Sequence, residues 1–195
     1  MTALNEHTAL STLRQDFLDT STTSMPLAGL ILWSIAGVAG LFLTPKLMAY
    51  SVAFGSGLIF PLALLIERLR GRNLMRGGKD NPLTGLFMQG IAMVVMLWPL
   101  VILGARAQPT FIVLGAAILA GLVWIPYGWA ANDPAGLRHA IARALLCYAA
   151  FIWMPADLKA SAICLAVVAC YLYSLVTMRR PGGAHATQGR ANVSV

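Results

Sequence analysis

The chain has 195 residues, of which 58% are hydrophobic and only 11% are charged, and its mean hydropathy is +0.74. A soluble domain carries about 25% charged residues, so this composition excludes an ordinary soluble domain and predicts an all-α, polytopic membrane protein. The net charge of +7 would favour nucleic-acid binding only if it were gathered on a soluble face. The basic residues lie instead in short loops and at the ends of apolar segments, so we expect no nucleic-acid partner.

Residues 1–25 form a polar N-terminal segment. Leu10, Leu13 and Phe17 recur at spacings of three and four residues, which places them on one face of a helix. We interpret the segment either as a short helix lying in the membrane interface or as a frayed tail. Three acidic residues before the first apolar run are atypical of a cleaved secretory signal: Glu6, Asp16 and Asp19.

Six apolar runs follow, each about as long as a helix that crosses a hydrocarbon core. They cover residues 26–43, 47–66, 83–104, 110–130, 137–154 and 160–178. The fifth run is the weakest, because Arg138, His139 and Arg143 stand at its start. We therefore predict a transmembrane domain of six helices over residues 26–178, followed by a polar, disordered tail over residues 179–195.

The short connections between the runs predict that sequence neighbours pack as three antiparallel hairpins. If the N-terminus is cytoplasmic, three of the fourteen Lys and Arg residues lie outside, namely Lys46, Arg106 and Lys159. The remaining eleven lie inside: Arg14, Arg68, Arg70, Arg72, Arg76, Lys79, Arg138, Arg143, Arg179, Arg180 and Arg190. Because basic residues concentrate on the cytoplasmic side of membrane proteins, this distribution predicts that both termini are cytoplasmic.

Three prolines interrupt the apolar runs. Each removes a backbone hydrogen bond and exposes a carbonyl about one turn earlier, which in a bilayer needs protein or trapped water as its partner. One interpretation is that the kinks open a central cavity, and the other is that they only bend the helices so that they pack. The candidate cavity or ligand contacts are the three prolines, residues close to them in sequence, and Gln89: Pro61, Pro99, Pro126, Gly57, Phe60, Trp98, Tyr127 and Gln89.

Gln89 is the first candidate among these for a ligand contact. Its amide lies about two turns into the third run, where it needs a hydrogen bond from another helix or from a cavity. The Tyr127 hydroxyl could point into such a pocket or anchor the chain at the membrane interface. Glu67, at the inner end of the second run, is a candidate gate, and a solvated charge beside two arginines is the alternative.

Two dipeptides predict where helices begin. Asn81-Pro82 and Asp133-Pro134 each read as a helix N-cap followed by proline at the first helical position. Their predicted role is structural.

The predicted spans show no pattern of residues that is typical of a catalytic site, a metal site or an ion-coupling site. No Asp, Glu, Lys or Arg is expected near the centre of any span, and all three histidines are expected outside the spans: His7, His139 and His185. The three cysteines lie in apolar runs without a CxxC spacing and are expected to be small buried hydrophobes: Cys147, Cys164 and Cys170. We therefore predict no metal site, no cofactor and no enzymatic activity.

Four short motifs give the chain a family resemblance. They are FGSGLIFPL at residues 54–62, KDNPL at residues 79–83, the Trp98-Pro99 pair and IPYGW at residues 125–129. Over residues 10–178 the chain resembles a family of small bacterial integral membrane proteins described as a domain of unknown function. The arginine-rich loop before Lys79 is longer than the family pattern. The resemblance implies a bacterial cytoplasmic membrane and supports the helical fold, but it brings no activity with it.

Two functions fit these observations. In the first, the protein binds or passes a small neutral or weakly polar solute through a cavity formed by the kinked helices. In the second, it is a non-transporting scaffold, whose small-residue faces hold partner helices and whose basic inner surface binds anionic lipids. The sequence leaves the solute, the energy coupling and the oligomeric state open.

Overall fold

The computed structural model describes residues 2–21, 23–71 and 80–178. Within these ranges the chain is helical and contains no strand. The helices are α1 (Thr2–Thr20), α2 (Ser24–Ala39), α3 (Pro45–Gly57), α4 (Ile59–Leu69), α5 (Pro82–Ala105), α6 (Thr110–Leu122), α7 (Trp124–Ala130), α8 (Pro134–Trp153) and α9 (Lys159–Thr177). The predicted all-α fold is confirmed for the described ranges. The predicted disordered tail and the arginine-rich loop over residues 72–79 lie outside them.

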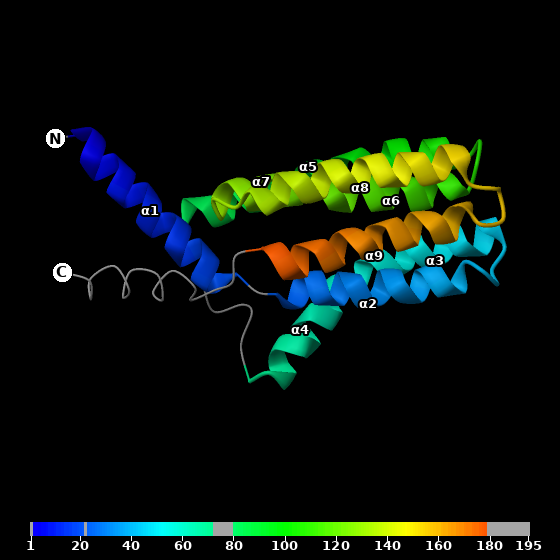
Figure 1. The fold of residues 1–195 in the computed structure, drawn as a ribbon, viewed down its shortest axis with the longest axis horizontal. Coiled ribbons are helices and arrows are strands. Elements are labelled where there is room, and N and C mark those ends of the chain that lie inside the picture. The colour runs from blue at the N-terminus through cyan, green and yellow to red at the C-terminus, as the bar shows by residue number, and fades with distance from the viewer. Residues whose placement is uncertain (1, 22, 72–79, 179–195) are drawn as a thin grey trace.

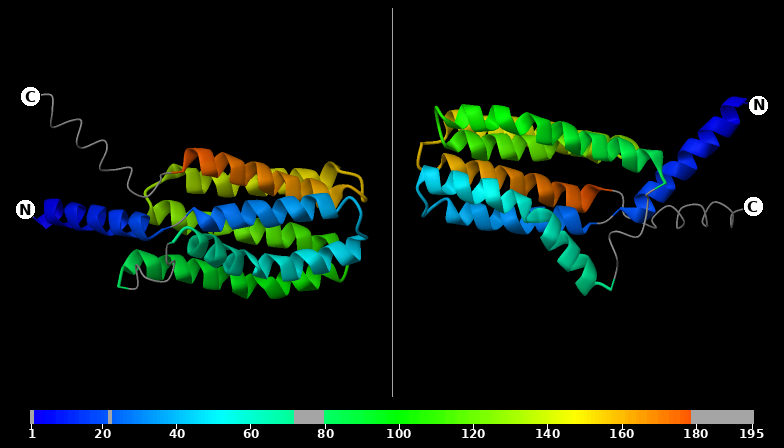
Figure 2. Two further views of the ribbon diagram at one scale, coloured as in Figure 1. Left: turned by 90° about the horizontal axis from the view of Figure 1, so that it is seen from below. Right: turned by 180° about the vertical axis from the view of Figure 1, so that it is seen from behind.

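Most of the helices run lengthwise through one bundle (Figure 1). The connections from α2 to α3, from α5 to α6 and from α8 to α9 all lie at one end, whereas α1 extends beyond the other end and α4 leans away from the bundle (Figures 1 and 2). By length and composition, four helical stretches of the described chain are long and apolar enough to cross a membrane, or up to six if each of two bent helix pairs counts as one span. The sequence and the structure therefore agree on a bundle of apolar helices that are suited to a membrane.

The starts of α3, α5 and α8 are fixed by a side chain and a proline. The Asn81 Oδ1 atom accepts a hydrogen bond from the Leu83 N–H at 2.9 Å, and Asp133 Oδ1 accepts one from the Ala135 N–H at 2.9 Å. Thr44 caps α3 in the same way, and each helix has proline at its first turn. The two predicted N-caps are confirmed.

Proline also decides where two of the apolar runs break. The predicted helix over residues 47–66 is wrong as a single element, because α3 ends at Gly57, α4 begins at Ile59, and the two are bent by 45°. The fourth run divides into α6 and α7 around Val123. Pro61 and Pro126 each follow the break by three residues, as expected from a missing N–H and a ring that crowds the preceding turn. Pro99, in contrast, stays inside the continuous helix α5.

The C-terminal half of α1 packs on the bundle. Phe17 and Leu18 are buried against Leu83, Ala130 and Ala131, which belong to α5 and to the end of α7. Two of the three residues on the predicted face, Leu13 and Phe17, thus pack against protein. Asn81 completes the contact, because its Nδ2 atom donates to the Leu13 carbonyl at 2.8 Å and to Asp16 Oδ2 at 2.7 Å.

Replacing Asn81 with alanine tests this contact. The variant loses the cap of α5 and both hydrogen bonds to α1, so we expect a loss of about 1–3 kcal/mol in unfolding free energy and faster proteolysis within residues 2–21. Limited proteolysis followed by mass spectrometry measures the second effect. An Asp133→Ala variant removes a cap without touching these bonds and serves as the control. Equal protection of α1 in wild type and Asn81→Ala would contradict the assignment.

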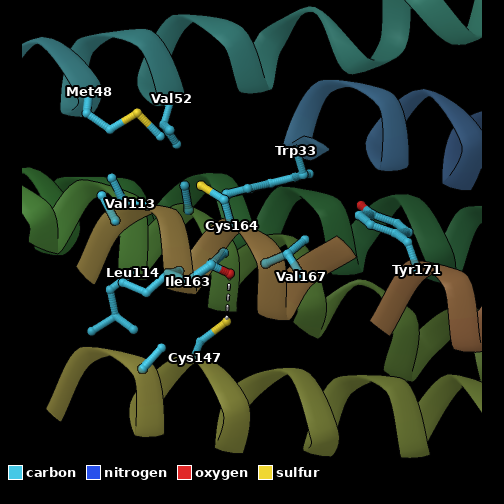
Figure 3. Close-up of a cluster of buried hydrophobic side chains, with 14 of the residues drawn as sticks. Trp33, Met48, Val52, Val113, Leu114, Cys147, Ile163, Cys164, Val167 and Tyr171 are labelled. Carbon is cyan, nitrogen blue, oxygen red and sulfur yellow. Dashed lines mark hydrogen bonds between the residues drawn. The ribbon is translucent and has the colours of Figure 1, made fainter. Parts of the chain in front are cut away.

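The main core lies between α2, α3, α6, α8 and α9. Helix α9 packs against both α2 and α8. Figure 3 shows Trp33, Met48, Val113, Ile163 and other buried side chains meeting from these helices. The three cysteines are buried and free, as predicted, and the Cys147 sulfur lies 4.0 Å from the Ile163 carbonyl. Where α7 meets α8, two glycines allow backbone contact, since a Cβ at Gly136 would lie 2.6 Å from the Gly128 Cα.

Candidate functional site

Two ionisable side chains lie in the middle of the bundle. His139 and Arg143 are both fully buried on α8, and Arg143 is the tenth of that helix's twenty residues. The prediction that no charge lies near the centre of a span is therefore wrong, and so is the placement of His139 outside the spans. The error has a physical origin: α8 begins at Pro134, three residues before the apolar run, so residues assigned to its entrance lie about one turn further inside.

The contacts of His139 assign the proton of its ring. Its Nδ1 atom lies 3.1 Å from the Cys170 carbonyl oxygen and 2.6 Å from the Ser174 hydroxyl, both on α9. A carbonyl oxygen only accepts, so Nδ1 carries the hydrogen and Nε2 is an acceptor. Arg143 Nη1 lies 3.5 Å from Nε2 and donates to it, at the long end of the hydrogen-bond range. The ring also stacks on Trp124, with 4.2 Å between centroids.

Aromatic rings surround the Arg143 guanidinium. Its Cζ atom lies 5.5 Å from the centroid of the Trp33 ring on α2 and 5.1 Å from that of Tyr171 on α9. Glycine at position 121 on α6 makes room for the side chain, because a Cβ there would lie 2.9 Å from Arg143 Cδ. Three helices, α2, α6 and α9, thus surround a cation that α8 carries.

The guanidinium is not neutralised within the described chain. Its Nε and Nη2 atoms are buried and have no hydrogen-bond partner, and none of the carboxylates that the structure describes pairs with it. Burying an ion without a counter-charge costs several kcal/mol, and each cation–π contact returns only about 1–2 kcal/mol. In a membrane span such a residue marks a binding or transport site by default.

The unpaired edge of Arg143 has a defined shape. The Nε–H and Nη2–H bonds point in parallel from one side of a guanidinium, and this edge matches the two oxygens of a carboxylate. The opposite amino group, Nη1, is the one that bonds His139. His139 therefore does not occupy the Nε–Nη2 edge of Arg143.

A second buried polar cluster lies where α4 meets the start of α2. Glu67 is only 3% exposed, so its interpretation as a solvated charge is wrong. The Ser24 hydroxyl donates to Glu67 Oε1 at 2.5 Å, and Arg70 Nη1 donates to Ser24 Oγ at 3.2 Å. These bonds tie the end of α4 to α2 after the bend at Leu58. A gating role for Glu67 stays a prediction.

The residues predicted around the proline kinks are not gathered at this site. Gln89, Gly57, Phe60, Pro61 and Pro99 are exposed, and no described residue makes the hydrogen bond expected for the Gln89 amide. The other three are half-buried, in separate contacts: Trp98 against the core, Pro126 against Gly90 of α5, and Tyr127 among Phe17, Phe87 and Trp124.

The sequence did contain a signal for the buried pair. His139, Arg143 and Cys147 are spaced by four residues, which puts them on one face of a helix, and all three are fully buried. A histidine and an arginine on the same face as a cysteine indicate that this face turns toward protein rather than lipid.

A model described as "Family of unknown function (DUF7010)" matches residues 10–180, which include Glu67, His139 and Arg143. The chain belongs to the DUF7010 family. The resemblance to an uncharacterised family is thereby confirmed. No curated protein and no solved structure matches this DUF7010 protein.

Proposed function

We propose that this DUF7010 protein is a six-span protein of a bacterial cytoplasmic membrane, with both termini in the cytoplasm, that binds a small carboxylate at Arg143. The observation that carries the proposal is the buried guanidinium whose Nε and Nη2 atoms have no partner among the described residues. The apolar helices support the membrane placement, and so does the distribution of basic residues, which is ten to three once the buried Arg143 is set aside.

The charge of the site favours an anion over the neutral solute expected from the sequence. That expectation rested on three kinked spans with few buried charges, and the buried Arg143 weakens its basis. One cation is offset by one negative charge, so a monocarboxylate is favoured over a dicarboxylate, which would leave one buried charge unpaired. The flanking Trp33 and Tyr171 rings suit an apolar body on the ligand.

We also propose that the role is binding or passage rather than catalysis. The Ser174 hydroxyl and His139 are close enough to suggest a nucleophile and its base. However, the Nδ1 atom that faces Ser174 already carries a hydrogen that the Cys170 carbonyl accepts, so it has no lone pair with which to take the hydroxyl proton.

Ligand binding by the full-length protein in lipid nanodiscs tests the proposal. We expect acetate, butyrate and benzoate to raise the thermal unfolding temperature, and the matched amides acetamide and benzamide to have no effect. A ligand at a hundred times its Kd stabilises a protein by about 2.7 kcal/mol. Arg143→Gln should abolish the shift, whereas Arg138→Gln, at an exposed position of the same helix, should retain it. Equal responses to acids and amides, or no response to either, would overturn the proposal.

A scaffold function is the second candidate, and one observation favours it. A Cβ at Gly55 or Gly57 would meet nothing within 4 Å in the described chain, so packing among the described residues does not require small residues there. Such positions allow another helix to approach closely. A partner that cross-links to position 55 in membranes, together with an absent carboxylate response, would favour this function over the first.

A further inference from the structure

A hollow lies between α1 and the turn that joins α7 to α8, away from the Arg143 site. Its volume is about 330 Å³, and its polar lining residues are Ser11, Arg14, Gln15 and Asn132, with Leu10 and Leu18 as apolar walls. It lies at the end of the bundle opposite the three short connections, where the positive-inside distribution places the cytoplasm (Figure 1).

Arg14 is the charged residue among those that line this hollow. Its Nε atom is buried and has no hydrogen-bond partner in the part of the chain that the structure describes. The guanidinium carbon lies 5.3 Å from the centroid of the Trp129 ring, which is 52% exposed. An arginine held over an exposed tryptophan at the end of an apolar span is placed at headgroup depth in a bilayer.

The neighbouring acids have donors of their own. Asp16 accepts a hydrogen bond from Asn81, and Asp19 accepts one from Gln15 at 3.0 Å. Asp133 accepts the Ala135 N–H. None of these three hydrogen bonds involves Arg14, whose Nε atom has no partner among the described residues.

The hollow is also held in shape before any ligand arrives. Phe17 and Leu18 anchor α1 on the bundle, and Asn81 bonds the Leu13 carbonyl one turn earlier. A site that is already formed loses little free energy to ordering when it binds.

We propose that this hollow binds the phosphate of an anionic phospholipid, with Arg14 as the main donor. A guanidinium suits phosphate oxygens, the amide group of Asn132 supplies a further donor, and Leu10 and Leu18 face the glycerol and upper acyl region. This site is independent of the carboxylate site at Arg143, so either can fail without the other.

The test uses the full-length protein in nanodiscs of phosphatidylcholine with and without phosphatidylglycerol, and counts retained phosphatidylglycerol by native mass spectrometry. We expect Arg14→Gln to lower retention about five-fold, since one basic residue near an anionic surface contributes about that factor. Arg14→Lys should retain part of the binding. Arg138→Gln removes an exposed charge from the first turns of α8 and should change nothing.

Three outcomes would overturn the proposal. Equal retention by Arg14→Gln and wild type would remove Arg14 from any site, and an equal loss in Arg138→Gln would indicate a diffuse basic surface. Displacement of the lipid by equimolar inorganic phosphate or glycerol phosphate would assign the hollow to a free phosphate instead. Unchanged unfolding temperatures of the variants, measured without ligand, separate loss of binding from loss of fold.

Discussion

An Arg143→Met variant is expected to unfold with a free energy at least equal to that of the unsubstituted protein, and up to about 3 kcal/mol higher. The reason is the desolvation of a guanidinium that has no carboxylate partner in the described chain. Methionine fills a similar volume without a charge. The lost contacts with Trp33 and Tyr171 subtract about 1–2 kcal/mol each at most, and the hydrogen bond to His139 is long.

The measurement is reversible unfolding in mixed micelles, in a buffer free of carboxylates. Arg138→Met, on the exposed side of the same helix, controls for a general effect of removing an arginine and should change stability by less than about 0.5 kcal/mol. A loss of about 3 kcal/mol or more in Arg143→Met would show that the arginine has a stabilising counter-charge. Combined with a lost carboxylate response, greater stability would identify Arg143 as a residue kept for binding at the expense of stability.

A Gly136→Ala variant is expected to lose about 3 kcal/mol or more, or to fail to fold. The added Cβ would lie 2.4 Å from the Trp124 carbonyl oxygen and 2.6 Å from the Gly128 Cα. Both are backbone atoms, so no side chain can rotate out of the way and α7 must move from α8. Because Trp124 stacks on His139, the movement should also disturb the Arg143 site.

Gly55→Ala is the matched control for this substitution. A Cβ there meets nothing within 4 Å, and alanine is the better helix former by about 1 kcal/mol, so stability should be equal or slightly higher. Unfolding of both variants in denaturant, followed by tryptophan fluorescence, compares them directly. A Gly136→Ala protein as stable as Gly55→Ala would mean that α7 and α8 are not in backbone contact.

Local chemistry made much of the helical layout predictable. Caps such as Asn81 and Asp133 act on the next two residues, and proline acts within one turn of itself, so their effects are written in short stretches of sequence. The breaks before Pro61 and Pro126 were therefore within reach, although the size of the bend at Leu58 was not. That bend depends on what α4 packs against.

The candidate site was largely beyond prediction from the sequence for the opposite reason. Arg143 and Glu67 look like ordinary charges at the ends of apolar runs, and their burial is produced by residues far away in the chain, such as Tyr171 and Ser24. Gln89 shows the converse: an amide inside an apolar run was expected to find a partner, yet it lies on the outer side of α5. The sequence shows which residues of a helix are polar, but it does not show whether their side chains face the interior of the bundle or its outer surface.

The close pairing of α2 with α9 has a consequence for how the protein is made. A Cβ at Gly29 would lie 2.5 Å from the Tyr171 ring, and one at Gly40 would lie 2.6 Å from the Ser161 hydroxyl, so the first long apolar helix is shaped to fit the last. The ribosome delivers α2 early and α9 at the end. Until then His139 lacks its acceptors on α9 and Arg143 lacks the Tyr171 ring. A chain truncated before α9 would therefore leave the α9 side of His139 and Arg143 uncovered.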